Sequence, residues 1–312
     1  MTTFCALAIS LVLSLVLTPI WRGWAARWGV MDHPVARSSH TEPIATCGGF
    51  AIFGAFWLST LVLQWPPSQV MIGMLVGSAI LVGVCFWDDT RGLPALPRLG
   101  AQVGVAILTY AWGLRVVGVT NPLSSWAGPE YLSVGYWSGP VTVLWIVFVV
   151  NAVNWLDGID GLAAGVSSIA AITLATVAIS GDRADIAIAA AALAGSALGF
   201  LRHNFSPAKV FMGDVGAMFL GYILACLAVG GAVKGPTALV LVVPVLVLGL
   251  PIYDSATTIL ARLWARRPIY YPDRAHLHHR LMDRGLSVRE TVLLMYGITG
   301  LLCMVALGVW LR

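Results

Sequence analysis

The chain has 312 residues, of which 59% are apolar and only 10% are charged, and its formal net charge is +4 at pH 7. A soluble globular domain carries about 25% charged residues, so this composition excludes an ordinary soluble domain. It predicts an all-α, polytopic integral membrane protein. We expect a single membrane-embedded domain over residues 1–312, because a bundle of spanning helices can be one unit at this length.

Apolar runs long enough to cross a bilayer, which takes about 20 residues, recur along the whole chain. We expect about ten transmembrane helices, and the boundaries of the fourth to seventh are the least sharply marked. The runs lie at 3–21, 46–64, 69–87, 99–119, 138–153, 162–180, 184–201, 215–233, 237–258 and 290–311.

Basic residues gather on alternate connections between these runs, which together hold 14 of the 18 Lys and Arg residues. The positive-inside rule makes this side cytoplasmic and places both termini on the other side. All six histidines and 11 of the 14 carboxylates lie on the cytoplasmic side too. A transporter needs polar groups along a path through the bilayer, whereas this sorting is typical of an enzyme at the inner leaflet.

Small residues inside the runs have packing roles. The five cysteines are widely spaced and form no CxxC pair, so we interpret them as core residues and not as a disulfide framework or a metal site. Close helix–helix contacts are predicted at pairs of glycines four residues apart, namely Gly73–Gly77, Gly161–Gly165 and Gly195–Gly199.

The third run ends in two adjacent carboxylates, Asp88 and Asp89. A carboxylate near the membrane is costly, and two neighbours repel, so the pair needs a divalent cation or an arginine nearby. Arg91 and Arg98 follow in the same loop. A hydrated helix end explains the pair as well as a functional site does, and both interpretations stay open.

The stretch Asn151–Gly165, NAVNWLDGIDGLAAG, places two amides and two carboxylates between apolar runs. If it is helical, Asp157 and Asp160 share a face, because residues three apart are neighbours on a helix. Its glycines favour a helix end or a tight turn equally well. This is where the sequence predicts chemistry.

The stretch Leu201–Gly221 contains a lone carboxylate, Asp214, flanked by Gly213 and Gly216. Phe211 is three residues before it, so an aromatic ring and a carboxylate could present together. The alternative is an N-cap for the following helix, which is a common role for Asp.

The connection Ala261–Glu290 is basic and carries His276, His278, His279 and Arg280. A zinc site would need four ligands, and no cysteine is near. A phosphate-binding patch fits better because Arg and His donate to phosphate oxygens. Positive-inside topology alone would explain the arginines but not three histidines in four positions.

Taken together, these stretches resemble the polyprenyl-phosphate N-acetylhexosamine-1-phosphate transferases, the family of WecA, TagO and MraY. The resemblance covers essentially the whole chain in order and is closer to the WecA/TagO branch. It is carried by DHPVARSSH, FWDDTRGLPALPRLGAQ, NAVNWLDGIDGLAAG, NFSPAKVFMGDVGAMFLG and DRAHLHHRLMDRGLSVRE.

The resemblance implies a site on the cytoplasmic loops at about 22–45, 88–98, 151–161, 202–214 and 259–289. It implies that Asp214 binds Mg2+, for which Mn2+ could substitute, with Asp157 as a second candidate ligand. Catalytic roles are implied for Asp88, Asp89, Asp157 and Asp214, with Asp88 positioning or deprotonating the lipid phosphate. Substrate contacts are implied for Asn154, Asp160, Asn204, Phe211, His276, His278, His279 and Arg280.

The chain departs from the family pattern in two places. The family's DDxxD motif has Gly92 at its fifth position, and its PxPxxGG motif reads PIATCGG here. These departures weaken any role for a third carboxylate and for Arg37 and His40, and the role of Asp254 stays open.

The implied reaction is attack of a polyprenyl phosphate on the β-phosphorus of a UDP-N-acetylhexosamine, most simply UDP-GlcNAc, giving a polyprenyl-diphospho-sugar and UMP. Alternatives are a 6-deoxy-N-acetylhexosamine or MurNAc-pentapeptide as the sugar, or a non-enzymatic transport or lipid-binding protein. The expected partners are a UDP-sugar, a polyprenyl phosphate and the membrane, without nucleic acid, and a homodimer is left open. The expected location is a bacterial inner membrane, with the site facing the cytoplasm.

Overall fold

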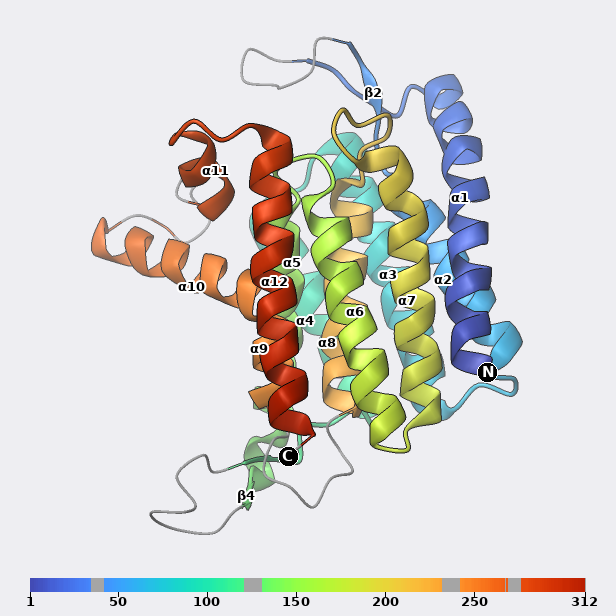
Figure 1. Cartoon of the computed structure of the whole chain (residues 1–312), viewed down its shortest axis with the longest axis vertical. Helices are drawn as coiled ribbons and strands as arrows, with labels where there is room; N and C mark the ends of the chain where they lie inside the picture. The colour runs from blue at the N-terminus through green and yellow to red at the C-terminus, as the bar shows by residue number, and fades with distance from the viewer. Residues whose placement is uncertain (35–41, 121–130, 232–241, 267, 269–275, 312) are drawn as a thin grey trace.

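The computed structural model describes residues 1–34, 42–120, 131–231, 242–266, 268 and 276–311. They form a helical bundle (Figure 1). Its helices are α1 (Thr2–Trp28), α2 (Gly49–Leu63), α3 (Gln69–Arg91), α4 (Ala95–Ala111), α5 (Ser138–Leu156), α6 (Leu162–Ser180), α7 (Ala184–Asn204), α8 (Gly213–Gly231), α9 (Val242–Val247), α10 (Gly249–Trp264), α11 (Leu277–Met282) and α12 (Val288–Trp310).

Two short antiparallel hairpins lie at opposite ends of the bundle (Figure 1). The first pairs β1 (Met31–Asp32) with β2 (Ile44–Ala45). The second pairs β3 (Gly118–Thr120) with β4 (Tyr131–Ser133), and a short 3-10 helix, η1 (Gly135–Trp137), follows it.

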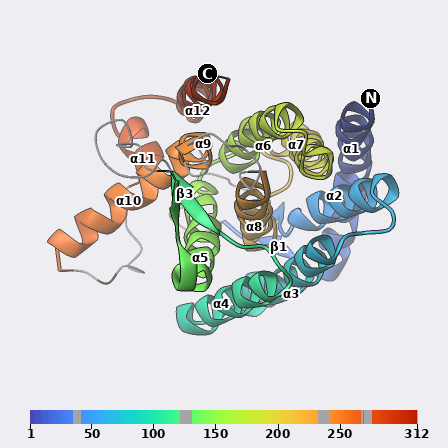
Figure 2. The same cartoon turned by 90° about the horizontal axis from the view of Figure 1, so that it is seen from below.

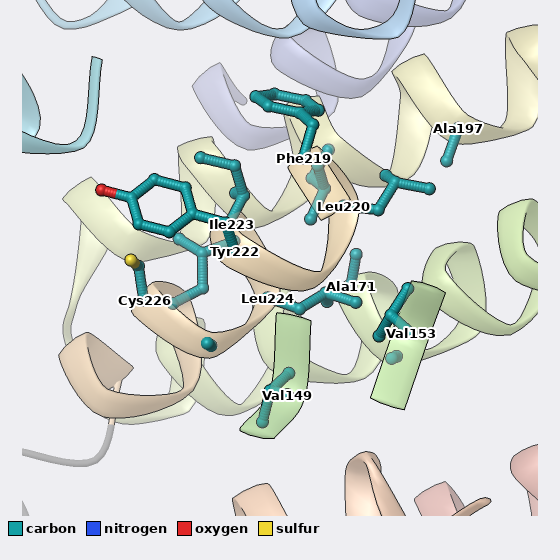
Figure 3. Packing of buried hydrophobic residues seen from close by; sticks show 14 of the residues in the cluster. Val149, Val153, Ala171, Ala197, Phe219, Leu220, Tyr222, Ile223, Leu224 and Cys226 are labelled. Carbon is teal, nitrogen blue, oxygen red and sulfur yellow. The ribbon is translucent and has the colours of Figure 1, made fainter. Parts of the chain in front are cut away.

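Helix α8 is the centre of the bundle. All of its residues from Val215 to Gly231 are buried, and the view along the bundle shows other helices on every side of it (Figure 2). Its apolar side chains pack between α5, α6 and α7, as Leu220 and Leu224 do near Val153, Ala171 and Ala197 (Figure 3). This packing holds α8 in place, and it therefore also fixes the position of the residues at the N-terminal end of α8.

Glycines let the helix backbones approach one another. A Cβ on Gly49 would collide with the backbone of Gly216, so α2 and α8 touch directly there. Gly195 and Gly199 of α7 face the backbone of α1 in the same way. The predicted packing role of the Gly195–Gly199 pair is confirmed.

Seven helices among the described residues are long and apolar enough to cross a membrane: α1, α3, the continuous segment Gly135–Leu156, α6, α7, α8 and α12. This supports the prediction of a polytopic membrane protein. Two further expected spans form shorter helices, α2 with 15 residues and α4 with 17. The count of ten spans stays a prediction.

The run expected at 237–258 is not one helix over the part that the structure describes. It divides into α9 and α10 at Leu248, because Pro251 has no N–H to continue the helix of Pro244 and its neighbours. Helix α10 then leads away from the bundle (Figure 1). Its exposed residues include Leu260 and Trp264, whereas Asp254 is buried. A helix whose apolar face points outward suits a lipid surrounding.

Both chain ends lie at the same end of the bundle, and α11 and the β1–β2 hairpin lie at the other (Figure 1). The placement of both termini on the non-cytoplasmic side stays a prediction. Arg37 and His40, whose role in the site the sequence supports only weakly, lie outside the described residues. Arg267 and Arg274 of the basic connection Ala261–Glu290 do too.

Substituting Gly49 with alanine tests the direct contact between α2 and α8. Gly49→Ala should lower stability by roughly 1–3 kcal/mol, the usual cost of overpacking, because the new methyl meets the Gly216 backbone and not a flexible side chain. Thermal unfolding of the purified protein measures it. Gly83→Ala is the matched control, since that exposed helical position has open space. Equal melting temperatures for Gly49→Ala and wild type would contradict the packing.

Candidate active site

An ion-pair bridge joins the end of α3 to the beginning of α8. Arg98 Nη1 lies 2.8 Å from Asp88 Oδ2 and 2.8 Å from Asp214 Oδ2. The other oxygen of Asp88 accepts a hydrogen bond from the backbone N–H of Leu93 at 2.6 Å. One guanidinium therefore holds two carboxylates from different helices close together despite their like charge.

The neighbouring carboxylate, Asp89, has a different task. Its oxygens accept hydrogen bonds from the backbone N–H groups of Asp214 at 3.1 Å and Val215 at 3.3 Å, and from the Cys47 thiol at 3.3 Å. It thus satisfies free N–H groups at the start of α8, where a negative charge is favoured. A Cβ on Gly213 would lie 2.5 Å from Asp89 Oδ2, and φ there is +69°, so this turn requires glycine.

Asp214 is held from two sides. Asn154 Nδ2 donates to Asp214 Oδ1 at 2.8 Å, while Arg98 holds the other oxygen. Asn154 in turn lies in the last turn of α5. The last turn of α5 and the start of α8 therefore meet at this carboxylate, which agrees with the placement that the resemblance implied for Asn154 and Asp214.

Asp157 directly follows α5 and has no side-chain hydrogen-bond donor among the described residues. Burial raises the pKa of the Asp157 carboxyl well above its usual range, and the nearby carboxylates of Asp214, Asp89 and Asp160 raise it further. Several carboxylates thus lie close together here, and Arg98 alone does not balance their negative charge. A cation would offset this imbalance.

Asp160 and Asn204 connect two loops beside this cluster. Asp160 Oδ2 accepts from the backbone N–H of Ala208 at 3.0 Å. Asn204 accepts from the N–H of Gly161 at 3.0 Å and donates to the carbonyl of Val210 at 2.9 Å. These bonds hold the loop after α7 against the stretch after α5. The amide of Asn204, 2% exposed, is committed to backbone groups.

The histidine stretch reaches the same end of the bundle. His278 is buried against Gly158, where a Cβ would come within 2.6 Å of its Nε2. Burial and the neighbouring His279 lower the pKa of His278 to about 4, so its ring is neutral at pH 7. Neither ring nitrogen has a hydrogen-bond partner among the described residues. Arg280, two residues after His278, is exposed.

Comparison with known proteins assigns this arrangement to a family. A family model described as Glycosyl transferase family 4 matches residues 71–232, which include α3, α5, the loop after α7 and α8. The chain belongs to glycosyl transferase family 4.

Named relatives of this family 4 chain match over most of their length. A Bacillus subtilis protein named "Probable undecaprenyl-phosphate N-acetylglucosaminyl 1-phosphate transferase" is 38% identical over 93% of this chain and 80% of its own. A Mycobacterium tuberculosis "Decaprenyl-phosphate N-acetylglucosaminephosphotransferase" is 32% identical over 87% and 74%. A Symbiobacterium thermophilum "Phospho-N-acetylmuramoyl-pentapeptide-transferase" is 30% identical over 94% and 90%.

Within this family 4 fold, the structure brings together Asp88, Asp89 and Asp214 directly, and Asn154 and Asp157 beside them. Phe211 comes three residues before Asp214, where its backbone pairs with Ala45 and Gly48. The sequence shows Arg98 only as a charge near Asp88 and Asp89, and its bridging position between Asp88 and Asp214 was not predicted. One feature of the sequence could have indicated a special role for Arg98. It is a single arginine near the start of an otherwise apolar helix, four residues before Gln102, which the structure buries.

The donor set of the family 4 site fits magnesium, which prefers oxygen ligands and keeps several waters. Asp214 and Asp157, which is close to the other carboxylates, are the side chains suited to hold it. No group of three or more His, Cys, Asp or Glu side chains forms a preformed metal site within the described residues. Two carboxylates are sufficient where water and substrate phosphate complete the coordination.

The raised pKa of the Asp157 carboxyl should make the stability of the protein depend on pH. The raised pKa means that the folded state favours the protonated carboxyl, so wild type loses stability as the pH rises from about 4, the usual value. Asp157→Asn cannot ionise. It should raise the melting temperature by a few degrees at pH 7 in EDTA, and the gain should vanish near pH 4.

Melting curves of the two proteins between pH 4 and pH 8 measure this difference. Asp182→Asn, an exposed carboxylate in the turn between α6 and α7, is the control and should change nothing. A gain in Asp157→Asn that is the same at every pH would contradict the raised pKa of the Asp157 carboxyl.

Proposed function

We propose that this chain transfers N-acetylglucosamine-1-phosphate from UDP-GlcNAc to a polyprenyl phosphate, undecaprenyl phosphate in a bacterial cell, as the first step of an envelope glycan. The observation that carries the proposal is the convergence of Asp88, Asp157 and Asp214 from separate parts of the chain around Arg98 and Asn154. The names of the relatives favour the same substrates.

The reaction forms one bond and breaks one. An oxygen of the lipid phosphate attacks the β-phosphorus of the UDP-sugar, the bond from that phosphorus to the bridging oxygen breaks, and UMP leaves with the electron pair. Such a phosphoryl transfer depends mainly on alignment and charge neutralisation. Two anions must meet in a partly dry site, where their repulsion is large without countercharge.

The residues divide this work. Magnesium held by Asp214 and Asp157 would neutralise the diphosphate oxygens. Asn154 fixes the orientation of Asp214, and Asp89 fixes the start of α8 on which Asp214 lies. Asp88 would position the lipid phosphate. That phosphate is largely ionised at pH 7, since its second pKa is about 6, so a general base contributes little.

The remaining candidate side chains would contact the uridine and the sugar. Phe211 would stack on the uracil ring, and Asp160 would accept its N–H. His279 and Arg280 on α11 would contact phosphate or sugar, next to the buried His278. The location that suits this chemistry is the inner leaflet of a bacterial cell membrane, with the site open to the cytoplasm where UDP-sugars are available.

The role of Asp214 can be tested in purified protein. Asp214→Asn should lower magnesium-dependent UMP release at least about a hundredfold, because a neutral amide is a poor ligand for a hard cation. The variant should still insert and give a monodisperse preparation. Asp182→Asn should release UMP at the wild-type rate, and near-normal turnover of Asp214→Asn would count against the assignment.

The role of Phe211 is separable from catalysis. Phe211→Ala should weaken binding of the UDP-sugar about fivefold to a hundredfold, the range expected for one lost base–aromatic stack, as measured by calorimetry with UMP and UDP-GlcNAc. Phe4→Ala, on the exposed face of α1, is the control. An unchanged nucleotide affinity would remove Phe211 from the pocket.

The donor sugar is settled by a panel assay. Purified protein with undecaprenyl phosphate is given UDP-GlcNAc, a UDP-6-deoxy-N-acetylhexosamine and UDP-MurNAc-pentapeptide, and UMP is measured. Release with UDP-GlcNAc supports the proposal. Release only with UDP-MurNAc-pentapeptide would favour the activity in the name of the Symbiobacterium relative, and no release with any donor would refute a transferase.

A further inference from the structure

A buried carboxylate on α10 lies outside the acidic cluster described above. Asp254 is only 1% exposed, on the inward face of a helix whose other face carries exposed apolar residues such as Leu260 and Trp264. A carboxylate buried this deeply is costly unless it is hydrogen-bonded. Its partners therefore indicate what it is for.

Both partners of Asp254 belong to the start of α11. Asp254 Oδ2 lies 2.8 Å from His276 Nδ1, and Asp254 Oδ1 accepts from the backbone N–H of Leu277 at 2.6 Å. An ionised carboxylate can only accept, so a hydrogen bond from His276 to an ionised Asp254 requires the tautomer with the proton on Nδ1. Because His276 gives α11 no side-chain cap, Asp254 satisfies one of the free N–H groups at its N-terminus from another helix.

Helix α11 has only six residues, too few to be stable without tertiary support. Its first residues are also tied to α5, since the His276 ring lies 5.7 Å from the ring of Trp155, and Arg262 of α10 lies 5.3 Å from the same ring. Trp155 stands between Asn154 and Asp157. The contacts of Asp254 thus join α10 and α11 to the part of α5 that reaches the acidic cluster.

We propose that Asp254 is a positioning residue: by holding His276 and the N-terminus of α11, it places His278, His279 and Arg280 beside the acidic cluster. It acts through α11 and touches no reacting atom. The link to turnover rests on the proposed function, whereas the anchoring of α11 does not. This separates the consequences of Asp254 from those of the residues that contact substrate.

Two measurements test the anchor without any assay of activity. In Asp254→Ala, hydrogen exchange at the amides of 277–282 should become about 10- to 100-fold faster, because a hydrogen bond to a charged group is lost. Exchange in α8 should stay unchanged. Ser255→Ala is the matched control, since Ser255 is equally buried on α10 and its hydroxyl has no partner among the described residues.

The second measurement follows the proton on His276. Magic-angle-spinning NMR of 15N-histidine-labelled protein in bilayers is practical with six histidines, and the His276→Gln spectrum assigns the signal. Wild type should show a protonated Nδ1. Asp254→Asn can still accept from Leu277 but presents an N–H to His276, so the proton should move to Nε2. A merely structural loss would not produce this exchange of tautomers.

Turnover completes the test. UMP release should fall about tenfold or more in Asp254→Ala and also in Asp254→Asn, which carries the experiment if the alanine variant fails to insert. Unchanged exchange at 277–282, an unprotonated Nδ1 in wild type, or wild-type turnover in both variants would each overturn the proposal. Absence of UMP release in wild type would refute the proposed function alone, and exchange and NMR would still decide the anchor.

Discussion

The site depends on one ionic contact, the Arg98 guanidinium between the carboxylates of Asp88 and Asp214. Without it, two negative charges from α3 and α8 would face each other at the end of a bundle whose core is mostly apolar. The guanidinium is suited to this task because its planar set of donors can serve two acceptors at once and it stays charged. The remaining acidic residues are arranged around this bridge.

The bundle gives that contact its rigidity. Asp214 lies at the start of α8, the most enclosed helix in the structure, and Asp89 accepts from its first N–H groups. Gly49 and Gly216 let α2 approach this same part of α8. Asp157 has no side-chain hydrogen-bond donor in the part of the chain that the structure describes, and its pKa is raised. Such a stability cost is typical of groups kept for binding or catalysis.

Much of this could be predicted from the sequence, and the failures have physical causes. Hydropathy located the long helices because lipid demands an apolar surface of fixed length, and the acidic motifs identified the right end of the bundle. The break between α9 and α10 was missed because both halves are apolar, and only Pro251 marked it. Asp88 and Asp89 are identical in type and adjacent, so the sequence could not tell which one binds Arg98 and which one caps α8.

The sequence also does not show in which direction a side chain points. Asn204 has the residue type of a ligand-binding amide, yet its amide is bonded to the backbone of Gly161 and Val210. The role of Asp254 stayed open in the sequence, where it follows Pro251 by three residues. Its partner His276 is 22 residues away, beyond any local pattern. Contacts of this kind depend on how α10 and α11 pack in the folded protein, which motif spacing does not determine.

If the acidic cluster serves the transfer of a sugar phosphate, the β-phosphorus must move to the lipid together with the sugar. Purified protein in bilayers with undecaprenyl phosphate and magnesium is given UDP-GlcNAc labelled at the β-phosphorus. The account predicts that the label moves into the lipid fraction, with one UMP released for each lipid product formed. Label that stays on the nucleotide as UDP while the sugar alone moves to lipid would contradict it.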